Sequence, residues 1–308
     1  MKDVVLAIDW GGTFVKLGLF RNNKIISKTS IPSKQASHPD KFLHILKEEL
    51  SIFLKDKGIS YNSLKSAGVG APGMIDIKNQ KIFYLPNIKG WKNYPFKKNF
   101  EKIFKIPVFI DNDANLMTLA ELKFGNAKDI NTAICITLGT GVGFGLVINS
   151  EVFRGRCSAG EGGHLTIDFK AGKCSCGSFG CIESFVGNER FVKSITKNNV
   201  KYPKDITPFL LYEMARKNDK FALSAWKHFG FLLGVYFSGL INIFNPEKII
   251  IGGGMAGAFS YFLPSLRDTI NKRAMYPMSK QVKIVRAKLR NDAGLLGANV
   301  LAQEGIGK

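Results

Sequence analysis

The feature that most constrains the fold is a pattern of strands, loops and turns that occurs twice in the chain. Residues 4–30 read as strand, Gly/Thr loop, strand, tight turn and strand, with the loop at Gly11-Gly12-Thr13. Residues 132–154 repeat this order around Gly139-Thr140-Gly141. Short apolar runs between turn residues predict buried strands. A repeat of this size predicts two similar α/β halves that face each other, although two glycine-rich hairpins can also match by chance.

The remaining sequence predicts the other elements of such halves. We expect strands at 66–69, 108–110, 248–251 and 282–287, helices at 39–55, 115–124 and 293–303, and helical stretches from 188 to 244. The segment from His228 to Pro246 carries no charge and is long enough to raise the question of a membrane span. Because Ser238 and Asn242 interrupt it and an apolar strand follows, it predicts a buried helix that leads into a buried strand.

Charge and cysteine content indicate the kind of protein and its compartment. The formal net charge is +20, 35 of the 44 basic residues are Lys, and the sequence contains no run of five basic residues. Readers of base edges rely on Arg, so we interpret this charge as a solvated lysine surface and expect no nucleic-acid partner; an anion-attracting field is the alternative. Met1-Lys2-Asp3 leads directly into a strand, without the apolar core of a signal peptide. Together with free cysteines, this predicts a cytoplasmic protein that binds no membrane.

Three glycine-rich turns follow predicted strands, at Gly11-Gly12-Thr13, Gly139-Thr140-Gly141 and Gly252-Gly253-Gly254. Glycine allows backbone N–H groups to approach phosphate oxygens closely, although tight hairpins need it too. Asp9 precedes the first turn and suits Mg²⁺ held through water, and Lys16 adds a positive charge toward phosphate. The three turns together favour a split nucleotide site, with the third beside the adenosine of ATP. No P-loop motif occurs in the sequence.

A metal site is predicted by one imidazole and three thiols with close spacing. The candidate ligands are His164, Cys174, Cys176 and Cys181. Such a set completes a tetrahedral structural Zn²⁺ site with no open position, so the metal should support the fold rather than catalyse. Reduced cysteines without metal are the alternative. Cys135 and Cys157 have no neighbouring ligand and are expected to be bystanders.

Carboxylates form a second group of candidates. Asp111-Asn112-Asp113-Ala114-Asn115 joins a predicted strand to a helix. It reads either as a helix cap or as a general base that takes a hydroxyl proton while an amide holds a sugar. Glu161 and Glu183 bracket the cysteine cluster and can accept hydrogen bonds from paired hydroxyls, or simply be surface acids.

With these motifs the sequence resembles the ROK family (repressor, open reading frame, sugar kinase) over essentially the whole chain. The motifs are Asp9-x-Gly11-Gly12-Thr13-x-x-Lys16, Ala71-Pro72-Gly73, Leu85-Pro86-Asn87 with Gly90-Trp91, Asn112-Asp113-Ala114-Asn115, Leu138-Gly139-Thr140-Gly141, Gly160-Glu161-Gly162-Gly163-His164, Cys174-x-Cys176-Gly177-x-x-Gly180-Cys181-x-Glu183 and Ala293-Gly294-Leu295-Leu296-Gly297-Ala298. The histidine and cysteine motifs are the most specific of these.

The resemblance implies an α/β fold of two facing actin-like, ribonuclease-H-like (hexokinase-type) domains with a cleft between them that holds ATP. Residues 1–116 with about 290–308 would form the smaller N-terminal domain, and 117–289 the larger C-terminal domain with the zinc site. It implies Asp113 as the general base. The implied sugar-binding residues are Gly73, Asn87, Asn112, Asp113, Glu161, His164 and Glu183. The implied nucleotide-binding residues are Asp9, Gly11, Gly12, Thr13, Lys16, Gly139, Thr140, Gly141, Gly253 and Gly254.

Four residues at three places depart from the family pattern. Phe144 stands where the second phosphate loop usually carries another Gly, which would narrow the nucleotide side. Asp111 replaces a common Glu. Val186-Gly187 replace a small Ala-Ser pair on the sugar side.

The predicted function is ATP-dependent phosphorylation of a hexose, with glucose as the first candidate and Mg²⁺-ATP as the donor. The alternatives in this class are N-acetylmannosamine, N-acetylglucosamine and fructose. The family also includes sugar-responsive repressors, whose helix-turn-helix domain precedes the first strand. Because the first strand here begins at Val4, we expect a kinase rather than a repressor. A zinc-containing sugar-binding protein without turnover is a third reading, and the family implies a homo-oligomer, a dimer or tetramer.

Overall fold

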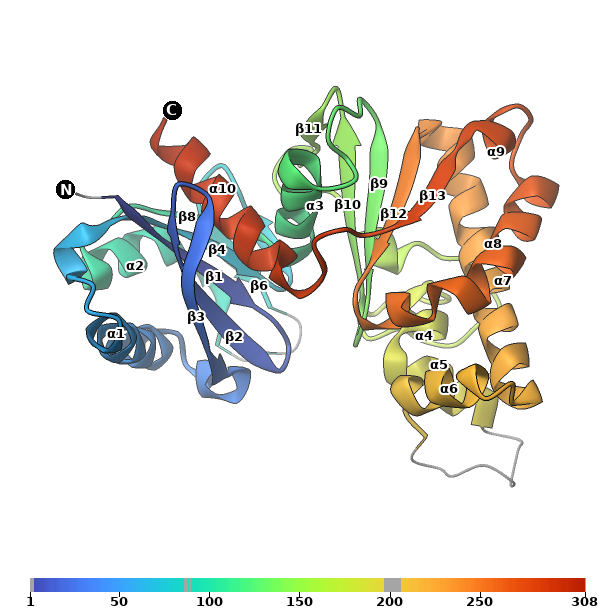
Figure 1. Ribbon diagram of the computed structural model, residues 1–308, viewed down its shortest axis with the longest axis horizontal. Coiled ribbons are helices and arrows are strands. Elements are labelled where there is room, and N and C mark those ends of the chain that lie inside the picture. The colour runs from blue at the N-terminus through green and yellow to red at the C-terminus, as the bar shows by residue number, and fades with distance from the viewer. Residues whose placement is uncertain (1–2, 86–87, 89, 197–205, 308) are drawn as a thin grey trace. The chain divides into compact units, whose positions relative to one another are not determined.

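The computed structural model describes residues 3–85, 88, 90–196 and 206–307. The chain divides into two compact units, each built around a five-stranded sheet (Figure 1). The first unit comprises Met1–Gly125, Val152–Gly160 and Asn291–Lys308, and the second comprises Asn126–Glu151 and Glu161–Arg290.

The sheet of the first unit mixes antiparallel and parallel strands. Its strands are β1 (Val4–Trp10), β2 (Phe14–Arg21), β3 (Lys24–Pro32), β4 (Leu64–Ala71) and β8 (Val108–Asn112), in the order β3-β2-β1-β4-β8. The first three strands form an antiparallel meander, whereas β1, β4 and β8 are parallel. Parallel strands place their carboxyl ends at one edge, where this unit carries its candidate functional loops.

Both faces of this sheet are covered, because its strands alternate apolar side chains between them. Val4, Leu6 and Ile8 lie in the core formed with α1 (Pro39–Asp56) and α2 (Phe96–Phe104). Val5 and Ala7 point to the other face, in the core formed with α3 (Asp113–Phe124) and α10 (Ala293–Ile306).

Glycine at residue 68 allows α10 to lie directly on β4. A Cβ atom at Gly68 would overlap the carbonyl group of Ala298. The C-terminal helix is thereby brought onto the sheet made by the N-terminal strands.

The second sheet repeats the topology of the first. It contains β9 (Ala133–Leu138), β10 (Val142–Ile148), β11 (Glu151–Val152), β12 (Lys248–Gly252) and β13 (Lys283–Arg286), in the order β11-β10-β9-β12-β13. The β9–β10 pair is antiparallel, and β9, β12 and β13 are parallel. The predicted internal repeat is therefore confirmed, strand for strand.

One face of the second sheet packs against α7 (Lys220–Phe244) and α8 (Phe259–Arg273). Gly230 permits close packing of these helices, because a Cβ atom there would overlap the Phe262 carbonyl. By length and composition α7 could cross a membrane, but half of its most apolar window is buried in the core of this unit. It leads into β12, so the predicted buried helix and strand are confirmed.

The remaining elements are short. A small antiparallel sheet contains β5 (Met74–Asp76), β6 (Lys81–Tyr84) and β7 (Lys92–Tyr94), and the short helices are α4 (Glu183–Val186), α5 (Asn188–Thr196), α6 (Pro208–Arg216) and α9 (Met278–Gln281). This sheet, α2 and α8 were not predicted from the sequence. The spacing of Phe96, Phe100 and Phe104, all buried, is a helical signal that could have found α2.

The unit boundaries differ in detail from the expected domains. Residue 116 falls inside α3, and the first unit continues to Gly125 because α3 packs on α10. A Cβ atom on Gly297 of α10 would overlap the backbone of Leu116, which shows how closely these helices approach. Residues 152–160 also belong to the first unit.

Candidate functional site

In the first unit the parallel strands bring two candidate loops to the same edge. Asp9 on β1 pairs in register with Gly70 on β4, and Gly70 pairs with Asp111 on β8. The loop after Asp9 and the Asn112-Asp113 segment therefore leave the sheet at the same level. This placement follows from the parallel pairing of β1, β4 and β8.

The first candidate phosphate loop is a tight hairpin between β1 and β2. The Gly11 N–H donates to the Phe14 carbonyl at 3.0 Å, and Gly12 and Thr13 are exposed. The Lys16 Nζ lies 3.1 Å from the Asp9 carboxylate, so the two charged residues predicted for this loop form an ion pair. The Asp9 side chain is only 16% exposed.

The first turn of α10 also contributes to this loop. The two carboxylate oxygens of Asp9 lie 2.6 and 2.7 Å from the position that a Cβ atom on Gly294 would take. Asp9 therefore lies against the start of a helix, where the helix dipole favours a negative charge. From the sequence, Gly294 was recognisable only as part of the tail motif.

The Asp111–Asn115 segment is both a helix cap and a candidate catalytic site. Asn112 caps α3 by accepting hydrogen bonds from the N–H groups of Ala114 and Asn115, at 2.8 and 3.3 Å. Its amide nitrogen donates to the Gly73 carbonyl at 3.0 Å, which joins two predicted sugar-binding residues. Asp113 is the first residue of α3, is partly buried and accepts from the Ala114 N–H at 2.9 Å.

Asp111 has a different environment from Asp113. It is fully buried, and its carboxylate accepts from Arg154 Nε at 2.6 Å and from Asn115 Nδ2 at 2.9 Å. These contacts give Asp111 a structural role, because they tie the end of β8 to Arg154 and to the first turns of α3. Arg154 was not identified from the sequence, since nothing local to it indicates a partner 43 positions away.

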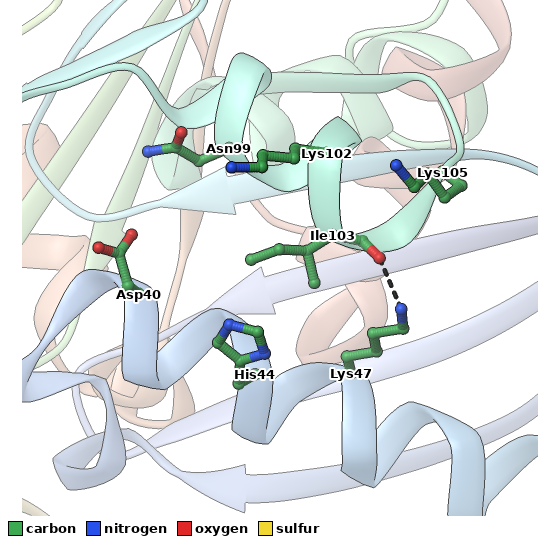
Figure 2. Close-up of a pocket in the computed structure, with 7 residues that line it drawn as sticks. All are labelled: Asp40, His44, Lys47, Asn99, Lys102, Ile103 and Lys105. Atoms are coloured by element: carbon green, nitrogen blue, oxygen red, sulfur yellow. Dashed lines mark hydrogen bonds between the residues drawn. The ribbon is translucent and has the colours of Figure 1, made fainter.

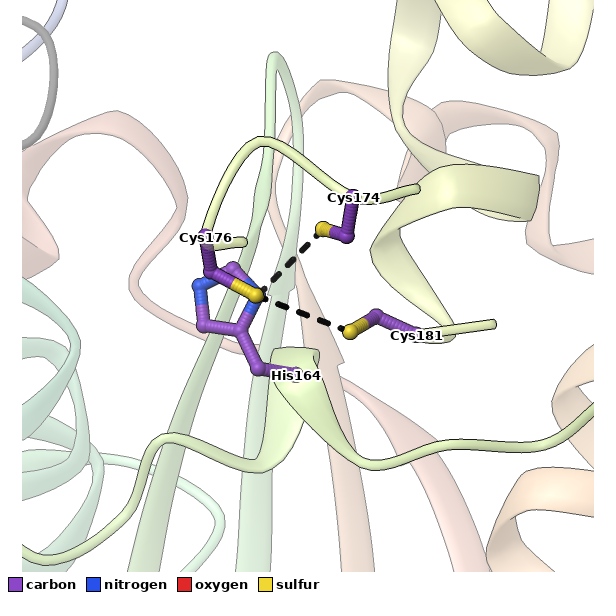
Figure 3. A group of neighbouring side chains, drawn as sticks. All are labelled: His164, Cys174, Cys176 and Cys181. Atoms are coloured by element: carbon purple, nitrogen blue, oxygen red, sulfur yellow. Dashed lines mark hydrogen bonds between the residues drawn. The ribbon is translucent and has the colours of Figure 1, made fainter. Parts of the chain in front are cut away.

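The second unit gathers the four predicted metal ligands (Figure 3). The ligand atoms of His164, Cys174, Cys176 and Cys181 all lie within 4.8 Å of one another. Cys174 Sγ lies 3.7 Å from His164 Nδ1, and Cys176 Sγ lies 3.7 Å from Cys181 Sγ. With Zn–S bonds of about 2.3 Å, a tetrahedral site requires sulfur atoms about 3.8 Å apart. The donor types and their spacing therefore fit a structural Zn²⁺.

The thiols of this cluster are electrostatically unequal without metal. Burial opposes ionisation of Cys174, but hydrogen bonds with Ser184, the Cys176 backbone, Arg190 and His164 lower its pKa to about 5. Burial and the neighbouring Cys176 and Cys174 raise the pKa of Cys181 to about 12. Arg190 Nη1 lies 3.7 Å from Cys174 Sγ, and this contact stabilises a thiolate at that position.

Three predicted sugar-binding residues share one neighbourhood beside this cluster. Desolvation raises the pKa of Glu161, the charge of His164 lowers it, and the carboxylate of Glu183 raises it again. Glu161, His164 and Glu183 are thus close enough to interact. Of the other predicted sugar-binding residues, Asn87 lies outside the described residues.

The second candidate phosphate loop, Gly139-Thr140-Gly141, is held by residues that follow the cysteine cluster. The Gly139 N–H donates to the Gly141 carbonyl at 3.0 Å, closing the turn. The Asn188 N–H donates to the Gly139 carbonyl at 2.9 Å, and the Val142 N–H donates to Glu183 Oε2 at 3.0 Å. The carboxylate of Glu183 is therefore engaged with this loop.

A pocket of about 520 Å³ lies within the second unit. Its lining includes Gly254, predicted as adenosine-side backbone, and Asn188, whose backbone N–H donates to Gly139 of the second candidate phosphate loop. Gly253 has a positive φ of 83°, and a Cβ atom there would overlap Leu138, at the start of that loop. Gly257 of the same glycine-rich segment also lines the pocket. The lining residues that were not predicted from the sequence are Thr207, Pro208, Phe209, Tyr212, Trp226, Met255, Ala258 and Arg286.

Phe144 does not line that pocket. It is buried in the core of the second unit, and a Cβ atom on Gly162 would lie 2.6 Å from its ring. Phe144 therefore packs against the Glu161–His164 segment. The sequence had instead predicted that Phe144 narrows the nucleotide-binding site.

Another hollow, of about 620 Å³, lies between α1 and α2 and contains none of the predicted residues (Figure 2). Lys47, Lys102 and Lys105 surround it, and Lys47 donates to the Ile103 carbonyl at 2.7 Å. Lys102 and Lys105 are exposed, in agreement with a solvated lysine surface.

Comparisons with known proteins identify the family. The ROK family model matches residues 5–305. A xylose repressor from Caldicellulosiruptor bescii is 31% identical to this chain, and the match covers 96% of this chain and 77% of the repressor. A glucokinase from Halalkalibacterium halodurans is also 31% identical, and the match covers 97% of this chain and 94% of the glucokinase. The structure of a ROK family glucokinase from Streptomyces griseus with glucose and AMPPNP has a TM-score of 0.84 at 26% identity and covers 98% of this chain and all of its own. The fold is thus the α/β, hexokinase-type fold expected from the sequence, and the chain belongs to the ROK family.

Proposed function

We propose that this protein is an ATP-dependent hexose kinase that converts glucose to glucose 6-phosphate. The observation that carries the proposal is the position of Asp113 in the first turn of α3. Asp113 follows Asn112, whose side-chain amide donates a hydrogen bond to the Gly73 carbonyl. A carboxylate at a helix N-terminus is stabilised as the anion, the form that accepts a proton.

In this proposal Asp113 takes the proton of the hexose hydroxyl as that oxygen attacks the γ-phosphorus of ATP. The P–O bond to ADP breaks, and Asp113 later releases the proton to solvent. Asn112, the Gly73 backbone, Asn87, Glu161, His164 and Glu183 would hold the other hydroxyls. Phosphoryl transfer needs mainly positioning and charge neutralisation, which these polar groups and loops are suited to provide.

The nucleotide would use both glycine-rich loops. Gly11, Gly12 and Thr13 of the first unit, and Gly139, Thr140 and Gly141 of the second, would present backbone N–H groups to phosphate oxygens. The pocket beside Gly253 and Gly254 suits a nucleoside, since its lining is largely apolar and aromatic with a few polar groups.

Charged residues beside the first loop would complete the phosphate site. Asp9 would hold Mg²⁺ through water, and the bound cation would neutralise phosphate charge. Lys16 forms an ion pair with Asp9 in this structure. With nucleotide bound, its ammonium group would contact a phosphate oxygen instead.

Zinc would have a structural role. His164, Cys174, Cys176 and Cys181 supply four ligands, which leaves no position open for substrate. His164 would bind the metal through one ring nitrogen and a sugar hydroxyl through the other, so the metal would orient a substrate contact.

Glucose is the hexose that we propose as the substrate. N-acetylmannosamine, N-acetylglucosamine and fructose are the alternatives, because the proposed contacts recognise hydroxyls common to these sugars. We also propose that the enzyme works in the cytoplasm as a homo-oligomer.

A sugar-responsive regulator is the second candidate, favoured by the identity of 31% to a xylose repressor. ATP turnover with a panel of hexoses and xylose separates the two candidates. A kinase forms ADP and sugar phosphate in equal amounts, whereas a regulator binds sugar without turnover and binds DNA tightly and specifically at physiological salt.

The role of Asp113 is tested with Asp113→Asn. We expect kcat to fall by about 10²- to 10⁴-fold with little change in sugar affinity, because only proton transfer is lost. Asp268→Asn, at an exposed position on α8, is the matched control and should retain full turnover. Near-normal turnover of Asp113→Asn would exclude Asp113 as the base.

A further inference from the structure

We infer that Arg190 neutralises the charge of the metal centre and thereby determines how tightly the four predicted ligands hold Zn²⁺. This inference rests on the structural zinc site of the proposed function. It adds a residue outside the ligand set, from the helix that follows the cysteine cluster, and gives that residue a positioning role beside Cys174.

The predicted ligand set has an unbalanced charge when the metal is bound. Zinc binds cysteine as the thiolate and histidine as the neutral imidazole. Three thiolates, one imidazole and Zn²⁺ therefore carry a net charge of −1 together. Cys174 and Cys181 are buried, with 3% and 0% of their surface exposed, so part of this charge is removed from water. A charge removed from water requires a partner of opposite sign within reach.

Arg190 places its guanidinium group against one of these buried sulfurs. Its Nη1 donates to Cys174 Sγ at 3.7 Å and to Ser184 Oγ at 3.1 Å, so the serine holds the guanidinium beside the sulfur. Cys174 Sγ also lies 3.7 Å from His164 Nδ1, and it is therefore among the atoms that surround the metal position. A guanidinium suits this place because it stays charged and presents its donors in a rigid plane.

The position of Arg190 is fixed by the packing of α5, in whose first turn it lies. The next residue, Phe191, is fully buried in the core of the second unit. Its ring centroid lies 4.9 Å from that of Phe229 and 5.8 Å from that of Trp226, both on α7. Because this packing fixes the backbone of α5, only the side chain of Arg190 has to be ordered to contact Cys174.

The same guanidinium lies near one proposed sugar contact. Arg190 Nη1 is 4.0 Å from Glu183 Oε1, and the Arg190 side chain is 37% exposed. An ion pair that is this long and partly exposed contributes little. If Arg190 served only Glu183, its removal would leave zinc affinity unchanged, and a measurement of zinc affinity therefore separates the two roles.

The experiment measures the zinc Kd of the full chain by competition with a chromophoric chelator, at one pH, for wild type, Arg190→Met and Arg190→Lys. We expect the Kd to rise about tenfold in Arg190→Met, as for loss of other residues that contact metal ligands. Methionine keeps a long side chain but has no charge and no donor. The Kd should rise less in Arg190→Lys, which keeps the charge but not the planar group.

Salt dependence separates neutralisation of charge from a packing role. Because the Arg190 side chain is partly exposed, dissolved ions screen its charge. The ratio of the zinc Kd of Arg190→Met to that of wild type should therefore shrink as the ionic strength rises from about 0.05 M to about 1 M. A ratio that does not depend on salt would overturn the inference in favour of packing. If Arg190→Met does not fold, Arg190→Gln provides the same comparison.

Lys193→Met is the matched control, because it removes one positive charge three positions later on the same helix. Lys193 pairs with Glu189 at 3.4 Å and its side chain is 77% exposed, so the zinc Kd should stay within about twofold of wild type. An equal rise in Lys193→Met and Arg190→Met would overturn the inference, because the net charge of the helix would then determine affinity.

Unchanged zinc affinity in Arg190→Met would overturn the inference and leave the metal site and the proposed kinase intact. A wild type that binds no zinc would refute the metal site of the proposed function, and the inference with it. Zinc binding is measured independently of turnover, so a wild type that binds zinc but phosphorylates no hexose would contradict the proposed reaction alone.

Discussion

The carboxylate of Asp9 lies against the backbone of Gly294, at the start of a helix that begins 284 positions later in the chain. Both oxygens are within 2.7 Å of the place where a side chain at residue 294 would begin. The position of the proposed Mg²⁺-binding carboxylate therefore depends on a glycine in the C-terminal helix.

Gly294→Ala should displace Asp9 and impair phosphoryl transfer. We expect kcat/KM for ATP to fall at least about tenfold and the Mg²⁺ requirement to rise, because misplaced charge loses transition-state stabilisation. Steady-state kinetics over a range of Mg²⁺ concentrations measure both effects. Gly239→Ala on α7, where a Cβ atom meets nothing within 4 Å, is the control and should be neutral or stabilising by up to about 1 kcal/mol. Unchanged Mg²⁺ dependence in Gly294→Ala would contradict this role.

Arg154→Met should destabilise the first unit. It leaves the buried carboxylate of Asp111 without its ion-pair partner, which costs about 3–5 kcal/mol for a buried pair. Denaturant unfolding measures the change. Arg216→Met, which removes an exposed ion pair with Glu213, is the matched control and should unfold like wild type. If Arg154→Met were as stable as Arg216→Met, the buried carboxylate of Asp111 would not require an ion-pair partner.

Loss of the metal site should unfold the second unit more readily. In Cys181→Ser, zinc content should fall from one equivalent to none, because a buried thiolate ligand is removed. The unfolding midpoint should fall by about 10 °C, as expected for several kcal/mol of lost binding free energy. Cys157→Ser, outside the cluster, should retain both zinc and stability. Retention of a full zinc equivalent in Cys181→Ser would exclude the assigned ligand set.

Acid should weaken the turn between β5 and β6. Burial opposes ionisation of Asp76, but hydrogen bonds from Asn79, the charge of Lys81 and the Lys78 backbone lower its pKa below 3.8. A carboxyl whose pKa is lower in the folded state contributes stability above its unfolded pKa and loses it as pH falls through the folded value. The free energy of unfolding should thus decrease more steeply below about pH 4 in wild type than in Asp76→Asn. Equal slopes would contradict the prediction.

Much of the architecture was predictable because it is encoded by local patterns. The two strand–loop–strand repeats follow from alternation of apolar runs with Gly and Thr, and the structure confirms them as two sheets of identical strand order. The small sheet β5-β6-β7 was not predictable in this way, since its strands have three or four residues and little alternation. The candidate metal ligands lie within 18 residues of one another, so spacing alone identified them.

The sequence by itself determined the repeated α/β halves, the glycine-rich loops and the cysteine cluster, because backbone preference and ligand spacing are properties of short segments. Only the tertiary structure decided that Arg154 neutralises Asp111, that Gly294 admits Asp9 and that Glu183 accepts a hydrogen bond from Val142. These pairs are far apart in the chain, and each depends on how the packed sheet, helices and loops bring particular side chains together. Burial then selects the partner, because a carboxylate removed from water must find a charge or a hydrogen-bond donor within reach.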